Sequence, residues 1–382
     1  MPGAVARRPI VPPEPRRVGR MKSITNRLLS ALTLASFTLM LAFLFPPTHV
    51  DGQESRTRPT PQPSASPSDE IIDDVDVVRV ESNLVVVPVS VTDAGGQPVL
   101  GLTTKDFRLL EEGRDQEIAQ IGDPEQVPLE IAILLDVSGS VHDRFAFEQA
   151  AISKFLKVVL KPGDRATIYS ITKKPRHDLP LDTAERVAAK ILTISPDPEK
   201  GPTAFYDTVV DAVQYLAQNT PERNRRVIVV VSDGEDNFSE KIKKVLGTTK
   251  DSQAAITPQA RQAVYNKILS EVQREVQKAE VTFYSINPSG LSLRLNVISQ
   301  RAQDGMSQLA TATGGTSFVP EKEENFDAVF RQIAAELRSQ YLLQYYSTSE
   351  APNGKYLRLN VTAPARPQVK VRSRQGYYAK RK

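Results

Sequence analysis

The chain has 382 residues with no cysteine and no tryptophan, and its 49 Lys and Arg against 45 Asp and Glu give a net charge of +4. Its length suggests about two domains, and a composition of 40% hydrophobic and 25% charged residues is that of a globular protein. The absence of cysteine excludes disulfide scaffolds, thiolate zinc sites, iron–sulfur clusters and cysteine nucleophiles. Three widely spaced histidines, His49, His142 and His177, do not favour a histidine-based metal centre.

The excess of basic charge lies at the amino terminus. Residues 1–27 contain seven Arg and Lys and one Glu, so residues 53–382 together carry a net charge of −1. Residues 28–45 follow as an apolar run of 18 residues without a charge. A basic flank before an apolar core is typical of an export signal. The charge distribution therefore disfavours nucleic-acid binding and predicts export.

The apolar run at residues 28–45 leaves two alternatives open. A cleaved signal usually has about 7–15 apolar residues, whereas a membrane-spanning anchor needs about 18 or more. Val50 and Gly52 suit the positions before a signal-peptidase cut at Gln53, which favours cleavage, and Met21 is an alternative start. In either case we expect the bulk of the chain in the periplasm, the cell envelope or the extracellular space.

Composition and pattern divide the chain into six segments. A stretch rich in Pro, Ser and charge cannot form a core and predicts an extended linker. The expected segments are a signal peptide or membrane anchor at 1–52, the linker at 53–76, a β-rich segment at 77–127, a central α/β domain at 128–320, a connecting helix at 321–340, and a second β-rich segment at 341–382.

The two β-rich segments show the alternation of strands with one buried face. Val85, Val87, Val89 and Val91 alternate with other residues, and three strand candidates follow residue 340. Each segment alone would leave strand edges exposed. We therefore predict that residues 77–125 and 341–380 pair into one β-sandwich-like unit beside the central domain.

Strand and helix patterns alternate in the central segment. Four short apolar runs have the composition of parallel strands that are buried on both faces, at residues 131–135, 166–171, 227–231 and 281–286. Helical patterns are found at residues 152–159, 203–218, 259–278 and 325–339. Repeated units of this kind predict a doubly wound, mostly parallel sheet with its ligand site at the carboxyl ends of the strands.

Polar side chains gather at these strand ends. Asp136, Ser138 and Ser140 follow the first strand, Thr203 opens a helix, and Asp233 follows the third strand. All five side chains offer oxygen, which selects Mg²⁺, Mn²⁺ or Ca²⁺ over zinc or copper. Mg²⁺ keeps several of its waters, so a few hydroxyls and water-bridged carboxylates suffice. The five residues therefore predict a divalent-cation site.

This pattern, D-x-S-x-S followed by a distant Thr and a distant Asp, resembles the metal-ion-dependent adhesion site (MIDAS) of the von Willebrand factor A (vWA) family. The resemblance covers about residues 128–320 and implies a vWA, Rossmann-like fold. It also implies that the serines and the threonine contact the metal, that the aspartates act largely through water, and that an open position accepts a carboxylate from a partner protein. Over residues 80–380, the segments VPVSVTDAGGQPVLGLTTKDFRLLEEG, LLDVSGS and VKVRSRQGYYA resemble a bacterial "VWFA-related" group of exported proteins.

Three functions compete for this site. The leading hypothesis is a non-enzymatic binding protein that uses the cation to hold an acidic residue of a protein partner. The alternatives are a structural envelope module, in which the metal only stabilises a loop, and an enzyme with a Ser138 or Ser140 nucleophile. The last is disfavoured because no G-x-S-x-G elbow surrounds the serines and no phosphate-binding loop or zinc-protease motif occurs. Residues 235–237 are expected to form a solvated acidic loop or a second cation site.

Overall fold

The computed structural model describes residues 83–138, 145–197, 201–236, 238–247, 256–290, 297–321 and 325–380. The chain divides into two units, and all of these residues belong to the second, residues 76–382. The expected export segment and linker, residues 1–76, lie outside the described ranges, as do Ser140 and His142. Within those ranges, no helix is both long enough and apolar enough to cross a bilayer.

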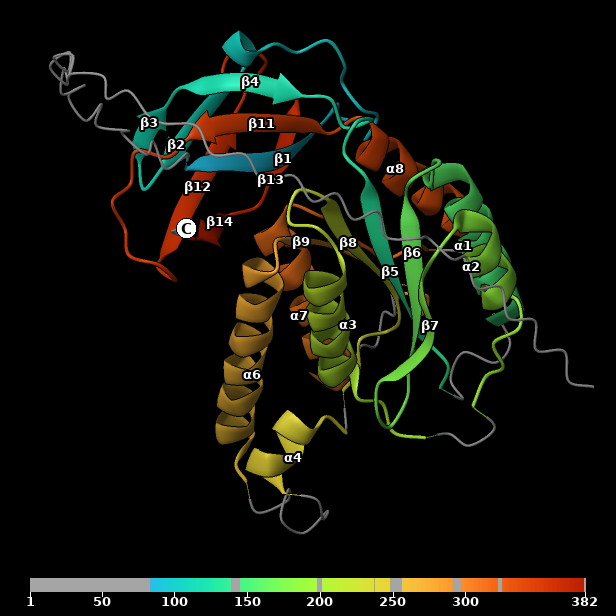
Figure 1. Ribbon diagram of the computed structural model, residues 1–382. Coiled ribbons are helices and arrows are strands. Elements are labelled where there is room, and N and C mark those ends of the chain that lie inside the picture. Colours follow the sequence, from blue (N-terminus) through green and yellow to red (C-terminus); the bar gives the residue numbers. More distant parts are fainter. Residues whose placement is uncertain are drawn as a thin grey trace, which may run out of the picture. The chain divides into compact units, whose positions relative to one another are not determined.

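A six-stranded sheet forms the centre of the fold, in the order β10-β9-β8-β5-β6-β7 (Figure 1). Its strands are parallel except β7, which pairs antiparallel with β6. Every residue of β5 is buried, as expected for a strand covered on both faces. The strands are β5 (Leu129–Asp136), β6 (Arg165–Ile171), β7 (Arg176–Asp182), β8 (Arg225–Val231), β9 (Val281–Ile286) and β10 (Ser317–Phe318).

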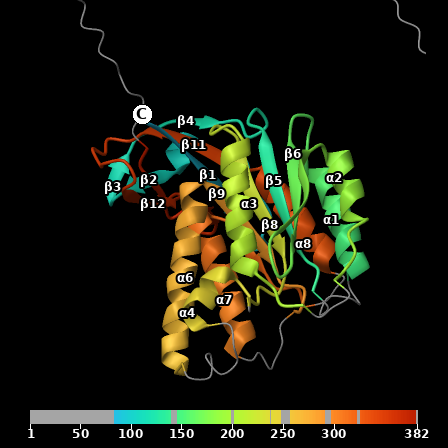
Figure 2. The same ribbon diagram turned by 60° about the horizontal axis from the view of Figure 1, so that its bottom comes forward.

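Helices cover both faces of this sheet (Figures 1 and 2). Side chains alternate along β5, so Ile131, Ile133 and Leu135 pack on α1, α2 and α8, whereas Ala132 and Leu134 pack on α3, α4, α6 and α7. The helices are α1 (Phe145–Val159), α2 (Ala184–Ile191), α3 (Phe205–Asn219), α4 (Glu240–Leu246), α6 (Pro258–Lys278), α7 (Val297–Thr313) and α8 (Phe326–Arg338).

A two-layered β-sandwich combines strands from both ends of the described chain. Two four-stranded sheets, β13-β1-β11-β4 and β14-β12-β2-β3, enclose a core of their own. The elements are β1 (Leu84–Thr92), the 3-10 helix η1 (Thr104–Asp106), β2 (Arg108–Glu111), β3 (Arg114–Gln116), β4 (Ile118–Gly122), β11 (Tyr341–Tyr346), β12 (Tyr356–Thr362), β13 (Lys370–Ser373) and β14 (Gly376–Tyr378). The predicted fold class, a doubly wound sheet with a flanking β-sandwich-like unit, is confirmed.

A buried carboxylate lies inside the sandwich. Glu111 is 3% exposed and accepts hydrogen bonds from the hydroxyls of Tyr345 (2.5 Å), Tyr377 (2.8 Å) and Ser347 (2.8 Å). These donors come from β11, from β14 and from the residue that follows β11. Buried polar groups need such partners, so this cluster fixes how the two sheets face each other.

Ion pairs connect the sandwich to the α/β unit. Arg374, which is 8% exposed, donates to Glu280 Oε2 at 3.0 Å, and Lys380 Nζ lies 3.0 Å from Glu280 Oε1. Arg372 contacts the fully buried side chain of Glu336 on α8 at 2.5 Å. Glu280 has a left-handed backbone (φ 55°), which is costly for a residue other than glycine.

We predict that Glu280→Gln lowers the free energy of unfolding at pH 7 by about 1–2 kcal/mol, in the lower part of the range for charged hydrogen bonds, because the side chain is 34% exposed. Burial alone would raise the pKa of Glu280, but the charges of Arg374 and Lys380 outweigh it and lower the pKa to about 2. The stabilisation is therefore complete above the unfolded-state value near 4.5 and is lost as the pH falls toward 2.

Urea unfolding at pH 7 and at pH 3 measures this dependence. The difference between wild type and Glu280→Gln should shrink at pH 3, whereas Glu117→Gln, at an exposed position, should match wild type at both. A pH-independent difference would contradict the assignment of Glu280 as an ionic contact.

Candidate metal centre

Asp136 is the last residue of β5, and its carboxylate is almost completely buried, with 1% of the residue exposed. The backbone N–H of Ser138 donates to Oδ1 at 2.9 Å, and the hydroxyl of Ser232 donates to Oδ2 at 2.8 Å. Ser232 directly follows β8, the neighbour of β5 in the sheet. The parallel pairing of the two strands therefore sets the position of this carboxylate.

Burial raises the pKa of Asp136, because it disfavours the charged form. The hydrogen bonds from Ser138 and Ser232 act in the opposite direction, and the negative charge of Glu235 raises the pKa further. Among the described residues, this carboxylate has no positively charged partner of the kind that buried ions usually have.

Asp233 lies just after the end of β8, where the negative charges of Asp136 and Glu235 act on its carboxylate. Its Oδ1 accepts a hydrogen bond from the backbone N–H of Glu235 at 3.0 Å. Burial is the largest cause that raises the pKa of Asp233 to about 6, the hydrogen bond from Glu235 opposes it, and the charges of Asp136 and Glu235 add to it. The two aspartates therefore interact as like charges in a poorly solvated place.

Thr203 lies just before α3 and is 6% exposed. Its hydroxyl donates to the carbonyl of Glu235 at 2.7 Å, and its own carbonyl accepts from the N–H of Phe238 at 3.0 Å. The segment that begins α3 is thereby held against the loop after β8. The structure thus brings Thr203 to the loop that carries Asp233.

Asp236 has a different role from the one expected from the sequence. It is 6% exposed, and its carboxylate accepts hydrogen bonds from the backbone N–H groups of Tyr206 (2.7 Å), Ser239 (2.9 Å) and Phe238 (3.2 Å). Because Tyr206 is in the first turn of α3, this carboxylate satisfies a free N–H of that helix. The expectation of a solvated acidic loop at residues 235–237 is therefore wrong at Asp236, and Asn237 lies outside the described residues.

The loop after β8 is packed against α7. Gly234 has φ +75°, and a Cβ at this position would lie 2.8 Å from the buried side chain of Met306. Only glycine fits both the backbone conformation and the space. Ser299 adds a hydrogen bond to Glu235 Oε1 at 2.6 Å. Glu235 is therefore held both by α7 and by Thr203, just before α3.

Four of the five residues predicted from the sequence lie in the described segments: Asp136, Ser138, Thr203 and Asp233. Hydrogen bonds or charge interactions connect these segments. Among the described residues, neither aspartate forms an ion pair with a lysine or arginine. In the same part of the chain, no group of three or more His, Asp or Glu side chains is placed to hold a metal. A cation here would depend on hydroxyl and water oxygens, which suits Mg²⁺.

Sequence patterns assigned no role to Ser232, and they placed Glu235 only in an acidic loop or a second cation site. Ser232 donates to Asp136, and the carbonyl of Glu235 accepts from Thr203. Ser232 could have been recognised because it directly follows β8 next to Asp233. The role of Glu235 depends on a main-chain atom, for which the sequence carries no signal.

The fold and the site together define an open α/β domain with an acidic, hydroxyl-containing site at the carboxyl ends of its central strands. Residues 131–235 match the VWA_2 family, the von Willebrand factor type A domain. This part of the chain is therefore a von Willebrand factor type A domain. No curated protein matches the chain.

Several solved structures are similar at low identity. The von Willebrand factor type A protein from Catenulispora acidiphila is 13% identical, with a TM-score of 0.41, over 79% of this chain and 64% of that one. The PilB minor pilin from Streptococcus sanguinis is 14% identical, with a TM-score of 0.42, over 56% and 62%. The proximal thread matrix protein 1 from the mussel byssus, with a zinc-occupied MIDAS motif, is 13% identical, with a TM-score of 0.36, over 55% and 48%. The chain spans less than two thirds of each of these proteins.

In a metal-free buffer with EDTA, we predict that the protein loses stability as the pH rises from about 4 to 7. The pKa of Asp233 is raised from 3.8 to about 6, so the folded state holds a proton that the unfolded state has released. This stabilisation is complete below 3.8 and is lost as the pH rises through 6, by about 1.4 kcal/mol for each unit of pKa difference at most.

Thermal melts at pH 5 and pH 7 test this dependence. The melting temperature of Asp233→Asn should fall less between pH 5 and pH 7 than that of wild type. Asp304→Asn, on the exposed side of α7, should behave as wild type. An equal fall in melting temperature in all three proteins would show that a raised pKa of Asp233 does not cause the pH dependence.

Proposed function

We propose that Asp136, Ser138, Ser140, Thr203 and Asp233 hold a divalent cation, Mg²⁺ or alternatively Mn²⁺ or Ca²⁺, and that this site binds an acidic residue of a protein partner. The observation that supports the proposal is the buried Asp136 beside the half-buried Asp233, each with a raised pKa. A cation is the simplest source of the positive charge that such a pair needs.

Electrostatics explains why a cation would suit this place. Two carboxylates that share a poorly solvated site repel each other and cannot both ionise without cost. Hydrogen bonds from Ser138 and Ser232 compensate Asp136 only in part, because burial is still the larger effect on its pKa. A hard cation would favour the ionised forms of both aspartates, and its preference for oxygen matches the residue types present.

Each residue would contribute in a distinct way. Ser138, Ser140 and Thr203 would supply hydroxyl oxygens, as the family resemblance implies, and the two aspartates would supply charge, largely through water. A bound cation would offer an open coordination position to an oxygen of a partner's carboxylate. Thr203 and Asp233 would act together, because Glu235 bonds to both through its main chain.

We propose that the protein acts outside the cytoplasm and binds rather than catalyses. The basic flank and the apolar run at residues 28–45 support export. The alternative function is a structural module of the cell envelope, in which the cation only stabilises the loop after β8. The two functions differ in whether the partner's attachment requires the metal.

We predict that the protein captures a partner from a cell-envelope extract by cross-linking in Mg²⁺ but not in EDTA. Asp136→Asn and Asp233→Asn should each reduce the Mg²⁺-dependent capture at least tenfold, because they remove the charge that holds the ion. Asp304→Asn should retain it.

Thermal melts of the same proteins separate the two functions. If Mg²⁺ raises the melting temperature of the wild type while capture is the same in Mg²⁺ and EDTA, the structural alternative holds and the binding function is wrong. Equal capture by wild type and both site variants would also overturn the binding function.

A further inference from the structure

A cavity of about 760 Å³ separates the β-sandwich from the amino-terminal ends of β8 and β9. Arg225 and Arg226 begin β8, and Val281 begins β9, and all three line this cavity. The candidate metal centre lies at the opposite, carboxyl ends of the parallel strands. The cavity, which we call the inter-sheet groove, is therefore a separate place on the molecule.

One wall of the groove is strongly basic. It contains Arg223, Arg225, Arg226, Arg374 and Lys380, and its acidic residues are Glu222 and Glu280. Within the described part of the chain, the first three arginines have no carboxylate at ion-pair distance. Basic residues therefore outnumber acidic ones in the lining, and a concave surface with an excess of positive charge attracts negatively charged ligands.

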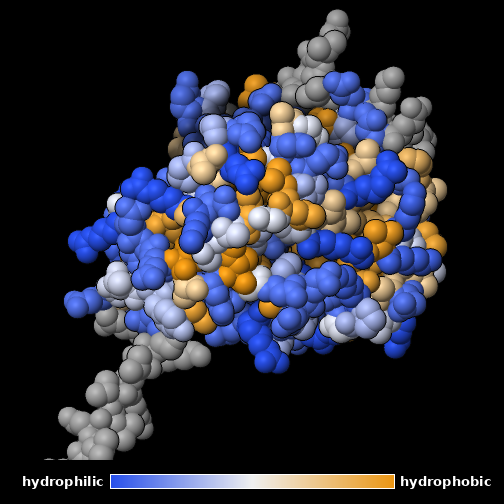
Figure 3. All heavy atoms as spheres, turned by 90° about the horizontal axis from the view of Figure 1, so that it is seen from above, coloured by the Kyte–Doolittle hydropathy of each residue, from blue (hydrophilic) through white to orange (hydrophobic). Residues whose placement is uncertain are grey.

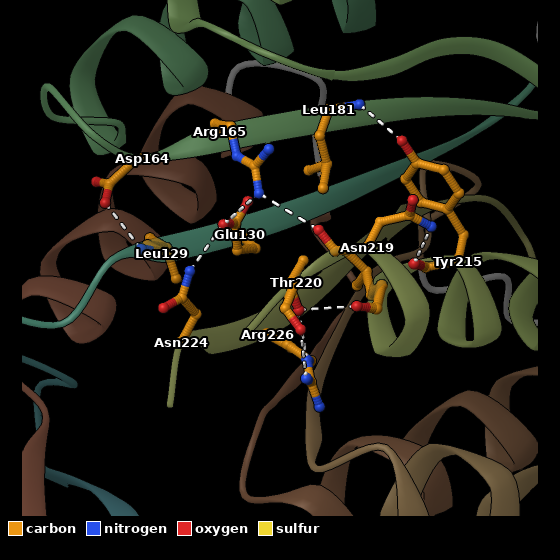
Figure 4. A network of polar contacts seen from close by, with 11 residues as sticks. Leu129, Glu130, Asp164, Arg165, Leu181, Tyr215, Asn219, Thr220, Asn224 and Arg226 are labelled. Atoms are coloured by element: carbon orange, nitrogen blue, oxygen red, sulfur yellow. Dashed lines mark hydrogen bonds and ion pairs between the residues drawn. The ribbon is translucent and has the colours of Figure 1, made fainter. Parts of the chain in front are cut away.

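The arginines of this wall are held in place by neutral acceptors. Arg226 is 5% exposed and donates to the hydroxyl and the carbonyl of Thr220 and to the carbonyl of Ala279. Figure 4 shows Arg226 beside Thr220, and Asn224 beside the buried carboxylate of Glu130. These direct partners carry no negative charge, and the charges of Glu280, Glu222 and Glu130 act on Arg226 without a direct contact among the described residues.

Arg374 adds a hydrogen-bond donor without a partner. It is 8% exposed, and its two terminal nitrogens donate to Glu280 Oε2 at 3.0 Å and to the carbonyl of Val86 at 2.9 Å. Its Nε is buried and has no hydrogen-bond partner among the residues that the structure describes.

Another part of the groove's lining comes from apolar side chains of β1 and β11. Leu84, Val86 and Pro88 alternate along β1 with the valines of the sandwich core, so they lie on the outer face of their sheet. Leu84 and Val86 are 44% and 37% exposed, which is high for apolar residues of a strand, and Leu342 on β11 pairs with Pro88. Figure 3, seen from above, shows hydrophobic side chains gathered in patches between hydrophilic ones.

We propose that the inter-sheet groove binds an extended acidic peptide segment of a partner protein. Side chains of an extended segment alternate between two sides, so carboxylates on one side can meet the arginine wall while apolar side chains on the other meet Leu84 and Val86. The amides of Asn83, Gln340 and Gln344, which also line the groove, can bond the peptide's main chain. This binding needs no metal, so it is independent of the function proposed above.

Fluorescence anisotropy of the full chain tests the proposal, in EDTA and at low salt. The probe is a fluorescein-labelled peptide of alternating glutamate and valine, and the matched peptide has glutamine in place of glutamate. Arg223→Glu is the test variant, because Arg223 is exposed and forms no ion pair in the described part of the chain. Arg114→Glu, an exposed arginine on β3 that does not line the groove, is the matched control.

We expect saturable binding of the glutamate peptide that Arg223→Glu weakens at least tenfold, that Arg114→Glu leaves unchanged, and that weakens as salt is added. Equal binding of the glutamine peptide, or an equal loss in Arg114→Glu, would show general attraction and overturn the proposal. If the wild-type chain does not bind the glutamate peptide, the proposal is wrong as well, and this includes the case in which the chain's own residues exclude the peptide.

Discussion

The burial of one carboxylate, that of Asp136, determines how the site is built. All eight residues of β5 are buried, and the strand ends on a side chain that loses its solvation when the sheet forms. Ser138 and Ser232 supply hydrogen bonds, but Glu235 and Asp233 add negative charge at the same sheet edge. The fold therefore concentrates negative charge at a poorly solvated sheet edge, and this is the observation on which the proposed divalent cation rests.

The loop after β8 turns this local constraint into a defined site. Its carboxylates have different tasks: Asp233 faces Asp136, whereas Asp236 caps α3 and so holds the start of that helix near Thr203. Gly234 allows the loop to approach Met306 on α7. Because α3, α7 and the loop are held against one another, Thr203 and Asp233 have defined positions without a ligand.

Local patterns allowed the central fold to be predicted, but not the contacts between residues that are distant in the sequence. The β-branched runs of β5, β6, β8 and β9 and the polar residues after them are local features, so strand ends and candidate ligands could be named together. The edge strand β7 contains charges and Pro180, and α7 is only weakly apolar, so neither was predicted. The hydrogen bond from Ser232 to Asp136, the cap by Asp236 and the Arg374–Glu280 pair join residues distant in sequence, which no periodicity reveals.

Titration of Mn²⁺ into the chelator-treated full chain, followed by electron paramagnetic resonance, tests the central claim most directly. Mn²⁺ replaces Mg²⁺ at oxygen sites, and its free form is observed separately from its bound form. We predict one bound ion per wild-type chain, competition by Mg²⁺, and loss of binding in Asp136→Asn with retention in Asp304→Asn. A wild-type chain that binds no Mn²⁺, or an Asp136→Asn chain that binds it equally well, would contradict the assignment of this site.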